Sequence, residues 1–146
     1  MDVANQEKVH FIRVDKDEDL FSSLEKWASD HQVKSGHLSG IGALKDVELG
    51  FYHLDKKEYA RKAFPKEAEL LSLEGNLTYL DGKPFFHIHT VLGDEQFRAY
   101  GGHLFSAKVA VTCEINFREF DQSISRSMNS EVGLNLLKLC PGDHSL

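Results

Sequence analysis

A single stretch of this chain carries apolar residues at helical spacing, and nearly everything after it alternates between apolar and polar residues. The helical stretch covers residues 20–31, and the alternation runs from residue 33 to about residue 120. Apolar residues three or four positions apart line one face of a helix, whereas strict alternation lines one face of a strand. One helix with about eight strands in hairpin succession predicts an α+β fold with a mostly antiparallel β-sheet.

The predicted helix has recognisable start and end signals. Residues 17–19, Asp-Glu-Asp, supply an N-cap and first-turn acids, which suit the positive end of the helix dipole. The face expected to be buried consists of Leu20, Leu24, Trp27 and Ala28, with His31 following at the same spacing. The pattern predicts one main amphipathic helix of roughly four turns. Since a cation is favoured at a helix C-terminus, we interpret His31 as a cap rather than a catalytic residue.

Segments of alternating residues, bounded by turn formers, predict the strands. They cover residues 8–14, 34–42, 47–53, 58–63, 69–80, 85–91, 97–104 and 107–120. Gly40 and Gly42 predict a bend or a close backbone approach, and Gly75 predicts a β-bulge. Residues 122–130 are polar and serine-rich and predict a mobile loop. A short apolar segment at 134–139 and a frayed tail at 141–146 complete the chain.

Length and composition are those of one globular domain. The 146 residues, 41% hydrophobic and 27% charged, are enough to bury a core without disulfides. We expect one domain over residues 1–146, with its core at about 8–139 and flexible termini. No apolar run approaches the ~20 residues that cross a bilayer, so no membrane partner is expected, and the first residues do not resemble a secretory signal.

The two cysteines predict a reduced, cytoplasmic protein. Cys113 and Cys140 are far apart and form no Cys-x-x-Cys pattern. Cys113 lies in an apolar alternation, so we interpret it as a small buried hydrophobe rather than a nucleophile.

The charge balance disfavours nucleic acid as a partner. The formal net charge is −6, and the 17 basic residues are scattered rather than gathered in a run. Non-specific DNA binding depends mainly on lysine and arginine neutralising phosphates. We therefore expect weak or no DNA binding at physiological salt.

The most informative candidate site is a His-x-His pair on a predicted strand. His87 and His89 lie two residues apart, so their side chains must project from the same face. His103, on the following strand, completes a cup of three imidazoles if the register brings it to that face. Paired residue numbers in an antiparallel hairpin have a constant sum: 190 places His103 opposite His87, whereas 189 points it away. A bulge at Gly101 and Gly102 could also re-aim the next side chain.

Three imidazoles with an open fourth position suit zinc or another borderline divalent ion. The residues alone leave open whether His87 and His89 bind a metal or small ligand or are a chance surface pair. Glu69, Glu74 and Glu114 lie in apolar strands and could either orient an imidazole or face solvent. Histidines without partners at ligand spacing are His10, His37, His53 and His144. No Ser-His-Asp or Cys-His arrangement and no phosphate-binding loop can be read from the spacing, so no catalytic residue is assigned.

A cupin fold is the second choice. Its metal motif begins with a glycine, reaches His-x-His several residues later and continues to a glutamate. Gly82, His87, His89 and Glu95 match that motif poorly, and the second cupin motif is missing after Gly102.

Five segments together resemble the PPC domain ("plants and prokaryotes conserved"). They are SGIGAL at 39–44, ELLSLEGNL at 69–77, GKPFFHIH at 82–89, YGGHL at 100–104 and VTCEI at 111–115. The resemblance implies an α+β fold with one main helix and an antiparallel sheet, assembled into homotrimers. In some prokaryotic members, the histidines that match His87, His89 and His103 hold a metal ion, usually taken as zinc, near a subunit boundary.

In land plants this domain follows an AT-hook, an Arg-Gly-Arg-Pro-type segment, and the proteins bind AT-rich DNA. Bacterial relatives therefore often carry a provisional DNA-binding name. This chain has no Arg-Gly-Arg segment, and KEAE at 66–69 matches the plant partner-binding segment only in part. Two functions remain: a metal-centred site for a small molecule, in an enzyme or a ligand sensor, or a non-enzymatic trimeric module that binds DNA or a protein partner. The histidine face favours the first.

Overall fold

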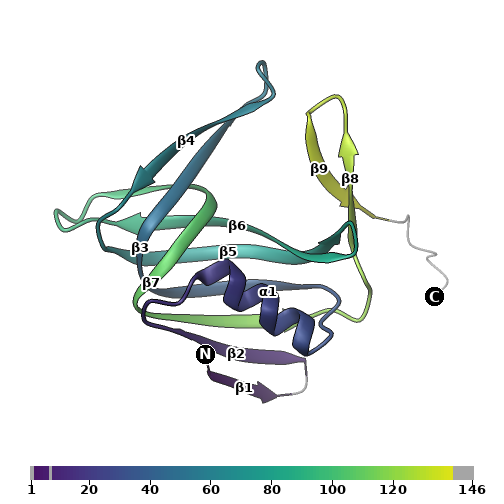
Figure 1. Ribbon diagram of the computed structural model, residues 1–146, viewed down its shortest axis with the longest axis horizontal. Coiled ribbons are helices and arrows are strands. Elements are labelled where there is room, and N and C mark those ends of the chain that lie inside the picture. Colours follow the sequence, from purple (N-terminus) through teal and green to yellow (C-terminus); the bar gives the residue numbers. More distant parts are fainter. Residues whose placement is uncertain (1, 7, 140–146) are drawn as a thin grey trace.

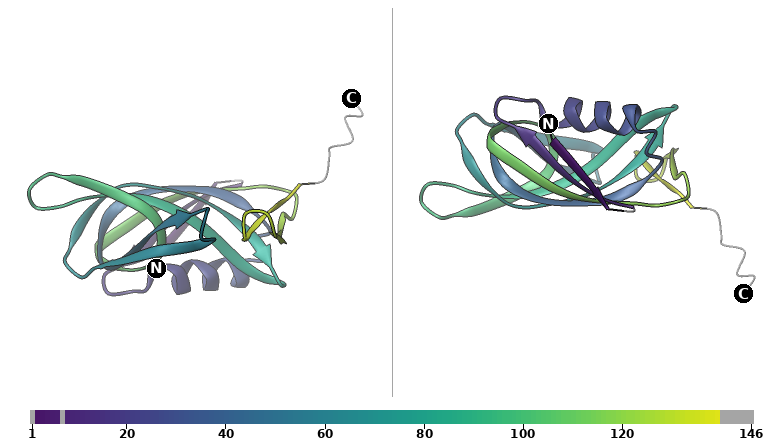
Figure 2. Two further views of the ribbon diagram at one scale, coloured as in Figure 1. Left: turned by 90° about the horizontal axis from the view of Figure 1, so that it is seen from above. Right: turned by 90° about the horizontal axis from the view of Figure 1, so that it is seen from below.

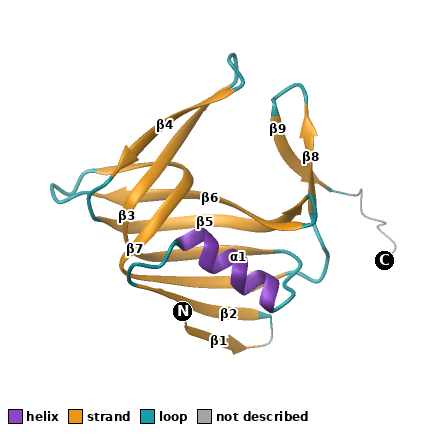
Figure 3. Ribbon diagram, viewed as in Figure 1, coloured by secondary structure: helices purple, strands orange, loops and turns teal. Residues whose placement is uncertain are grey.

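The computed structural model describes residues 2–6 and 8–139, in which one helix lies against a nine-stranded sheet (Figures 1 and 3). The helix is α1 (Leu20–Asp30). The strands are β1 (Asp2–Gln6), β2 (Val9–Asp15), β3 (Gly36–His53), β4 (Glu58–Phe64), β5 (Ala68–Leu80), β6 (Lys83–Gly93), β7 (Ala99–Glu119), β8 (Ser125–Asn129) and β9 (Leu134–Lys138). Within the described residues, no helix has the length and hydropathy needed to span a membrane.

The strand order is β1-β2-β7-β3-β5-β8-β9, with β4 paired to β3. Because β6 pairs with both β5 and β7, strands β7, β3, β5 and β6 form a closed circuit of pairings. Figure 2 shows these strands curving around one another. The pairings are antiparallel except for one parallel contact of β5 with β8, between Tyr79 and Ser125. The predicted α+β class, mostly antiparallel strands with one helix, is confirmed.

The core lies between α1 and the inner face of the sheet. Buried residues of the helix are Leu20, Leu24, Trp27 and Ala28, as the sequence predicts. They join one apolar cluster with sheet residues such as Ile88 and Phe117, and the rings of Trp27 and Phe117 meet edge to face at 5.0 Å. Burying each large side chain contributes ~1.5–3 kcal/mol, which holds the helix on this face. Because side chains alternate along a strand, every second residue of each core strand projects from the opposite face of the sheet.

The helix ends agree with the predicted caps, but the helix is shorter than predicted. The Asp19 carboxylate accepts the backbone N–H of Ser22 at 2.9 Å, so Asp19 is the N-cap. Asp17 and Glu18 precede this cap and therefore do not act as first-turn acids. His31 is the C-cap, and its Nδ1 lies 2.9 Å from the carbonyl oxygen of Trp27. The 11 residues of α1 make about three turns rather than four.

Two strands are longer than the sequence predicts. Strand β3 joins the predicted strands at 34–42 and 47–53, and β7 joins those at 97–104 and 107–120. The pairing of β3 with β7 shifts register between Gly42 and Leu44 and again between Lys45 and Leu49. Each bulge bends a strand without ending it, so the break in alternation marks a bend rather than a turn.

Three further predictions need correction or completion. The predicted loop at 122–130 contains β8, which pairs with β9 through backbone groups and so needs no apolar alternation. Residues 2–6, for which no strand is predicted, pair with β2. The bulge expected at Gly75 lies at Leu71 instead, where the β5–β6 register shifts, whereas the irregularity at Gly40 and Gly42 is confirmed. The predicted tail at 141–146 lies outside the described residues.

Candidate metal centre

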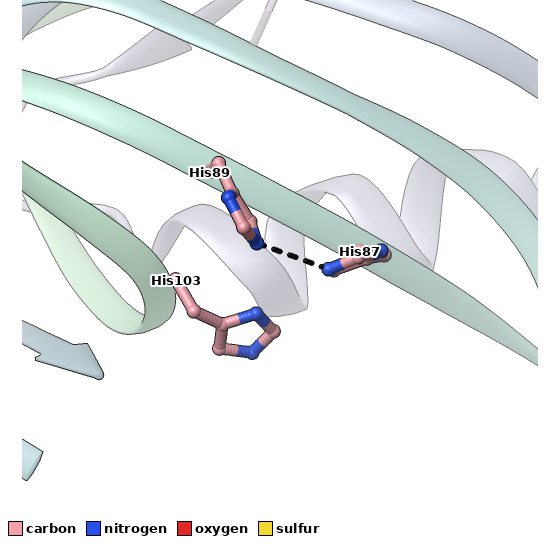
Figure 4. A group of neighbouring side chains, drawn as sticks. All are labelled: His87, His89 and His103. Atoms are coloured by element: carbon pink, nitrogen blue, oxygen red, sulfur yellow. Dashed lines mark hydrogen bonds between the residues drawn. The ribbon is translucent and has the colours of Figure 1, made fainter. Parts of the chain in front are cut away.

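Three histidines from two adjacent strands converge on the sheet face opposite the core. His87 and His89 lie on β6 and His103 lies on β7, and Figure 4 shows the three imidazoles turned toward one another. The register is neither of the two considered above, whose sums are 190 and 189. His103 pairs with His89, which makes the sum 192. Because this sum is even, as 190 is, the three side chains share one face, and the register condition for a three-histidine cup is met.

Glycines allow the strands of the site to approach closely. A Cβ atom at Gly75 would lie 2.4 Å from the backbone oxygen of His87, and one at Gly101 would lie 2.4 Å from that of Thr90. The β6–β7 pairing runs from His89 to Gly93 without a register shift, so the suggested bulge at Gly101 and Gly102 is absent there. A side chain at either position would clash with the β6 backbone, so the two glycines allow β5 and β7 to pair closely with β6.

The geometry of the cluster is that of a possible metal site. The Nε2 atoms of His87 and His89 lie 3.2 Å apart, and one nitrogen from each of the three residues lies within 4.8 Å of the others. Ring centroids are 5.0 to 5.4 Å apart. Zn–N bonds are ~2.0–2.1 Å long, so nitrogens around one ion lie ~3–4 Å apart. Small side-chain rotations would bring this set to that spacing.

The surroundings keep two of these imidazoles neutral. Burial, followed by the charges of Arg126 and His89, lowers the pKa of His87 from 6.5 to about 4. Burial, followed by the charges of His87, His89 and Arg61, lowers the pKa of His103 to about 4. Imidazole must be unprotonated to bind a metal. His87 and His103 are therefore in their metal-binding form at neutral pH.

A buried nitrogen of the cluster lacks a partner. Nδ1 of His103 is buried and has no hydrogen bond within the described part of the chain. A ring nitrogen of His103 faces His87 and His89 in Figure 4. A buried polar atom normally has a partner, because desolvating it without one costs ~1–3 kcal/mol. A metal ion in the cup would supply that partner, so the donor set fits a divalent ion.

None of the suggested carboxylates forms a hydrogen bond to the three histidines within the described residues. Glu74 is opposite His89 in the β5–β6 register, but its carboxylate lies 3.0 Å from Nε2 of His37. Glu69 and Glu114 are exposed. Glu74 therefore contacts an imidazole, but that imidazole belongs to His37 and not to the three-histidine cluster.

Aromatic and cationic side chains surround the cup. The ring of His103 lies 5.0 Å from that of Tyr59 and 4.7 Å from that of Phe105. The guanidinium of Arg61 lies over the Phe105 ring at 3.8 Å, and that of Arg126 lies 5.2 Å from the Phe85 ring. Sequence reasoning missed these residues, because none carries a spacing signal that ties it to the histidines.

Other candidates have structural roles. The ring of His10 packs 5.2 Å from Trp27, and its Nε2 lies 3.2 Å from the Glu119 carboxylate. Cys113 is fully buried, and burial raises the pKa of its thiol to about 12, which agrees with the predicted buried hydrophobe. His144 and Cys140 lie outside the described residues.

One family model matches most of this chain. The model of the Plants and Prokaryotes Conserved (PCC) domain matches residues 1–121. Among proteins of curated function, none is similar to this chain in sequence.

Solved structures resemble nearly the whole chain. A metal-containing protein of Archaeoglobus fulgidus is 33% identical, with a TM-score of 0.84, and the match covers 94% of this chain and 96% of that one. A plant- and prokaryote-conserved protein of Pyrococcus horikoshii is 29% identical, with a TM-score of 0.84 and coverages of 95% and 94%. A protein of Bacteroides thetaiotaomicron, provisionally named as DNA-binding, is 25% identical, with a TM-score of 0.90 and coverages of 94% and 96%.

Proposed function

Because this chain belongs to the Plants and Prokaryotes Conserved (PCC) domain family, we propose that it is a metal-centred protein that binds a small ligand. In this proposal His87, His89 and His103 hold one divalent ion, zinc being the best match to three imidazoles. The protein is a homotrimer, as the family resemblance implies. The proposal concerns binding and assigns no catalytic residue.

The observation that best supports this proposal is the convergence of three ring nitrogens, one of which is buried and has no hydrogen-bond partner among the described residues. The similar Archaeoglobus protein is named as metal-containing, which supports it independently. A three-histidine ion with an open position can polarise a carbonyl or lower the pKa of a bound water to ~7. The chain's own part is to keep His87 and His103 neutral by burial and to hold them on two paired strands.

Elemental analysis of untagged protein tests the metal site. We expect a near-stoichiometric amount of a divalent metal, with zinc predominant, because three converging imidazoles on a fixed sheet need little rearrangement to bind it. A His-tag must be absent, since it binds the same ions. Protein that is metal-free after purification and fails to take up added zinc would contradict the proposal.

The trimer requires a surface on which copies of the chain can meet. Exposed apolar side chains on the outer sheet face include Phe11, Ile41 and Leu71, which are 55%, 59% and 52% exposed. They line one hollow of about 740 Å³ together with polar residues such as Glu74 and Glu114. Exposed apolar patches of this kind are typical of protein interfaces.

Light scattering at micromolar concentration should report about three chain masses. Replacing Ile41 with glutamate should dissociate the assembly, because it places a charge in the proposed interface. Leu54→Glu is a matched control, since Leu54 has the same 59% exposure but is not part of this hollow. A stable monomer in the unmodified protein would rule out the trimer.

DNA binding is the alternative function, supported by the provisional names of similar structures. The net charge of −6 opposes it, and a trimer carries about three times that charge. Saturable, sequence-selective binding of an AT-rich duplex at nanomolar concentration and near-physiological salt would reverse this ranking.

A further inference from the structure

Arg126, on β8, differs from the other arginines of the chain. The remaining four, Arg13, Arg61, Arg98 and Arg118, are exposed, whereas Arg126 is half-buried. Arg61 pairs with Glu48 at 2.8 Å and Arg98 with Asp94 at 2.8 Å. Among residues 8–139, no carboxylate lies within ion-pair distance of Arg126.

The guanidinium of Arg126 is held by neutral groups. Nε donates to the Thr78 hydroxyl at 2.9 Å, Nη2 donates to Oδ1 of Asn76 at 2.8 Å, and Nη1 donates to the Asn135 carbonyl at 2.9 Å. A guanidinium has five N–H donors, so two remain. The cation is thus fixed in orientation, while the described residues supply neither a counter-charge nor acceptors for all of its N–H groups.

This cation lies on the same sheet face as the histidines. Its guanidinium is 5.2 Å from the ring of Phe85, which shares a face with His87 and His89 by strand alternation. One of its anchors, Asn76, is the direct β5 partner of His87.

Two hairpins meet next to the site and hold Arg126 in place. The Tyr52 hydroxyl on β3 donates to the Val132 carbonyl in the turn between β8 and β9. Lys57, in the turn between β3 and β4, donates to the Ser130 carbonyl at 2.6 Å. The β8–β9 hairpin, which carries Arg126, is therefore tied to the hairpin that carries Tyr59 and Arg61. This arrangement positions a cation beside the cup in advance of any ligand.

We propose that Arg126 recognises the carboxylate of a small ligand whose neighbouring oxygen coordinates the ion held by the three histidines. The inference rests on the proposed metal site and specifies its ligand class: a 2-hydroxy or 2-oxo carboxylic acid. A planar guanidinium with two free N–H donors matches a planar carboxylate. A half-buried cation without a counter-charge gains most from an anion, and no carboxylate among residues 8–139 pairs with it.

The test uses Co²⁺-loaded protein, because the visible spectrum of Co²⁺ reports a ligand that enters its open position. The probes are glycolate and glycolamide, which have nearly the same shape and share a hydroxyl oxygen and a neighbouring carbonyl oxygen but differ in charge. In the unmodified protein glycolate should bind more tightly than glycolamide. Arg126→Met should weaken glycolate binding about tenfold or more, because it removes a charge-assisted interaction, and should leave glycolamide binding unchanged. Arg126→Lys should recover part of the loss.

Controls separate recognition from folding. Co²⁺ content and the ligand-free spectrum should be equal in Arg126→Met and the unmodified protein. Arg98→Met is the matched control, since Arg98 is tied to Asp94 in the β6–β7 turn, and it should bind both probes normally. If Arg126→Met weakens the binding of both probes equally, or of neither probe, the proposed role of Arg126 is wrong. Tighter binding of inorganic phosphate than of glycolate would overturn the carboxylate class. Failure of the unmodified protein to take up Co²⁺ would instead refute the metal site, and this inference with it.

Discussion

Bound metal is expected to be lost when His89 is replaced by alanine. His89 supplies one of three converging nitrogens, and its Nε2 lies 3.2 Å from that of His87. Structural zinc sites with four ligands bind with ~10–16 kcal/mol, so one ligand accounts for roughly 3 kcal/mol. That corresponds to roughly a hundredfold or greater loss of affinity. Competition with a chromophoric zinc chelator at neutral pH measures it directly.

His53→Ala is the matched control for that experiment. His53 lies at the end of β3, its ring contacts Phe51, and it does not belong to the three-histidine cluster. This variant should keep its metal. Equal zinc affinity in His89→Ala and the unmodified protein would reject the assignment of His89.

Gly75→Ala is expected to destabilise the protein by about 3 kcal/mol, because the new methyl group would overlap the backbone of the neighbouring strand. The added Cβ would lie 2.4 Å from the backbone oxygen of His87 and 3.0 Å from a side-chain carbon of Ile88. Backbone in the middle of a paired strand cannot move aside as a flexible side chain can. Thermal unfolding should show a midpoint lowered by roughly 10 °C. Zinc affinity should fall as well, since His87 would be displaced.

Gly93→Ala provides the comparison on the same pair of strands. The three atoms nearest to a Cβ at Gly93 would all be side-chain carbons of Leu71, the closest at 3.2 Å, and this side chain can shift. We expect a change in the midpoint of a few degrees at most. Equal destabilisation by both substitutions would mean that glycine flexibility, rather than close approach at Gly75, explains the effect.

The shared face of His87 and His89 could be predicted because it depends only on strand geometry. Alternation is local and holds whichever strands pair with β6. The identification of α1 was equally local, since Leu20, Leu24 and Trp27 recur at helical spacing and Asp19 caps the first turn. For such features the nearest neighbours in the chain supply the decisive interactions.

The partner of His103 could not be predicted in the same way. Asp94 accepts the backbone N–H groups of Gln96 and Arg98, and this closes the β6–β7 turn. The turn sets the register with a sum of 192 and so places His103 opposite His89. Turn closure depends on side-chain hydrogen bonds that hydrophobic alternation does not encode.

The two arginines beside the cup, Arg61 and Arg126, show most clearly which features depend on the tertiary structure. Alternation determined which faces of the strands are buried and that His87 and His89 project together. Only the folded chain brings Arg126 to Asn76, fifty residues earlier, and Arg61 to the ring of Phe105. The lowered pKa values of His87 and His103 also arise there, because burial and charge depend on groups that are distant in the chain. Local geometry thus determined which histidines could converge, whereas long-range strand pairing decided their spacing, their protonation and the cation beside them.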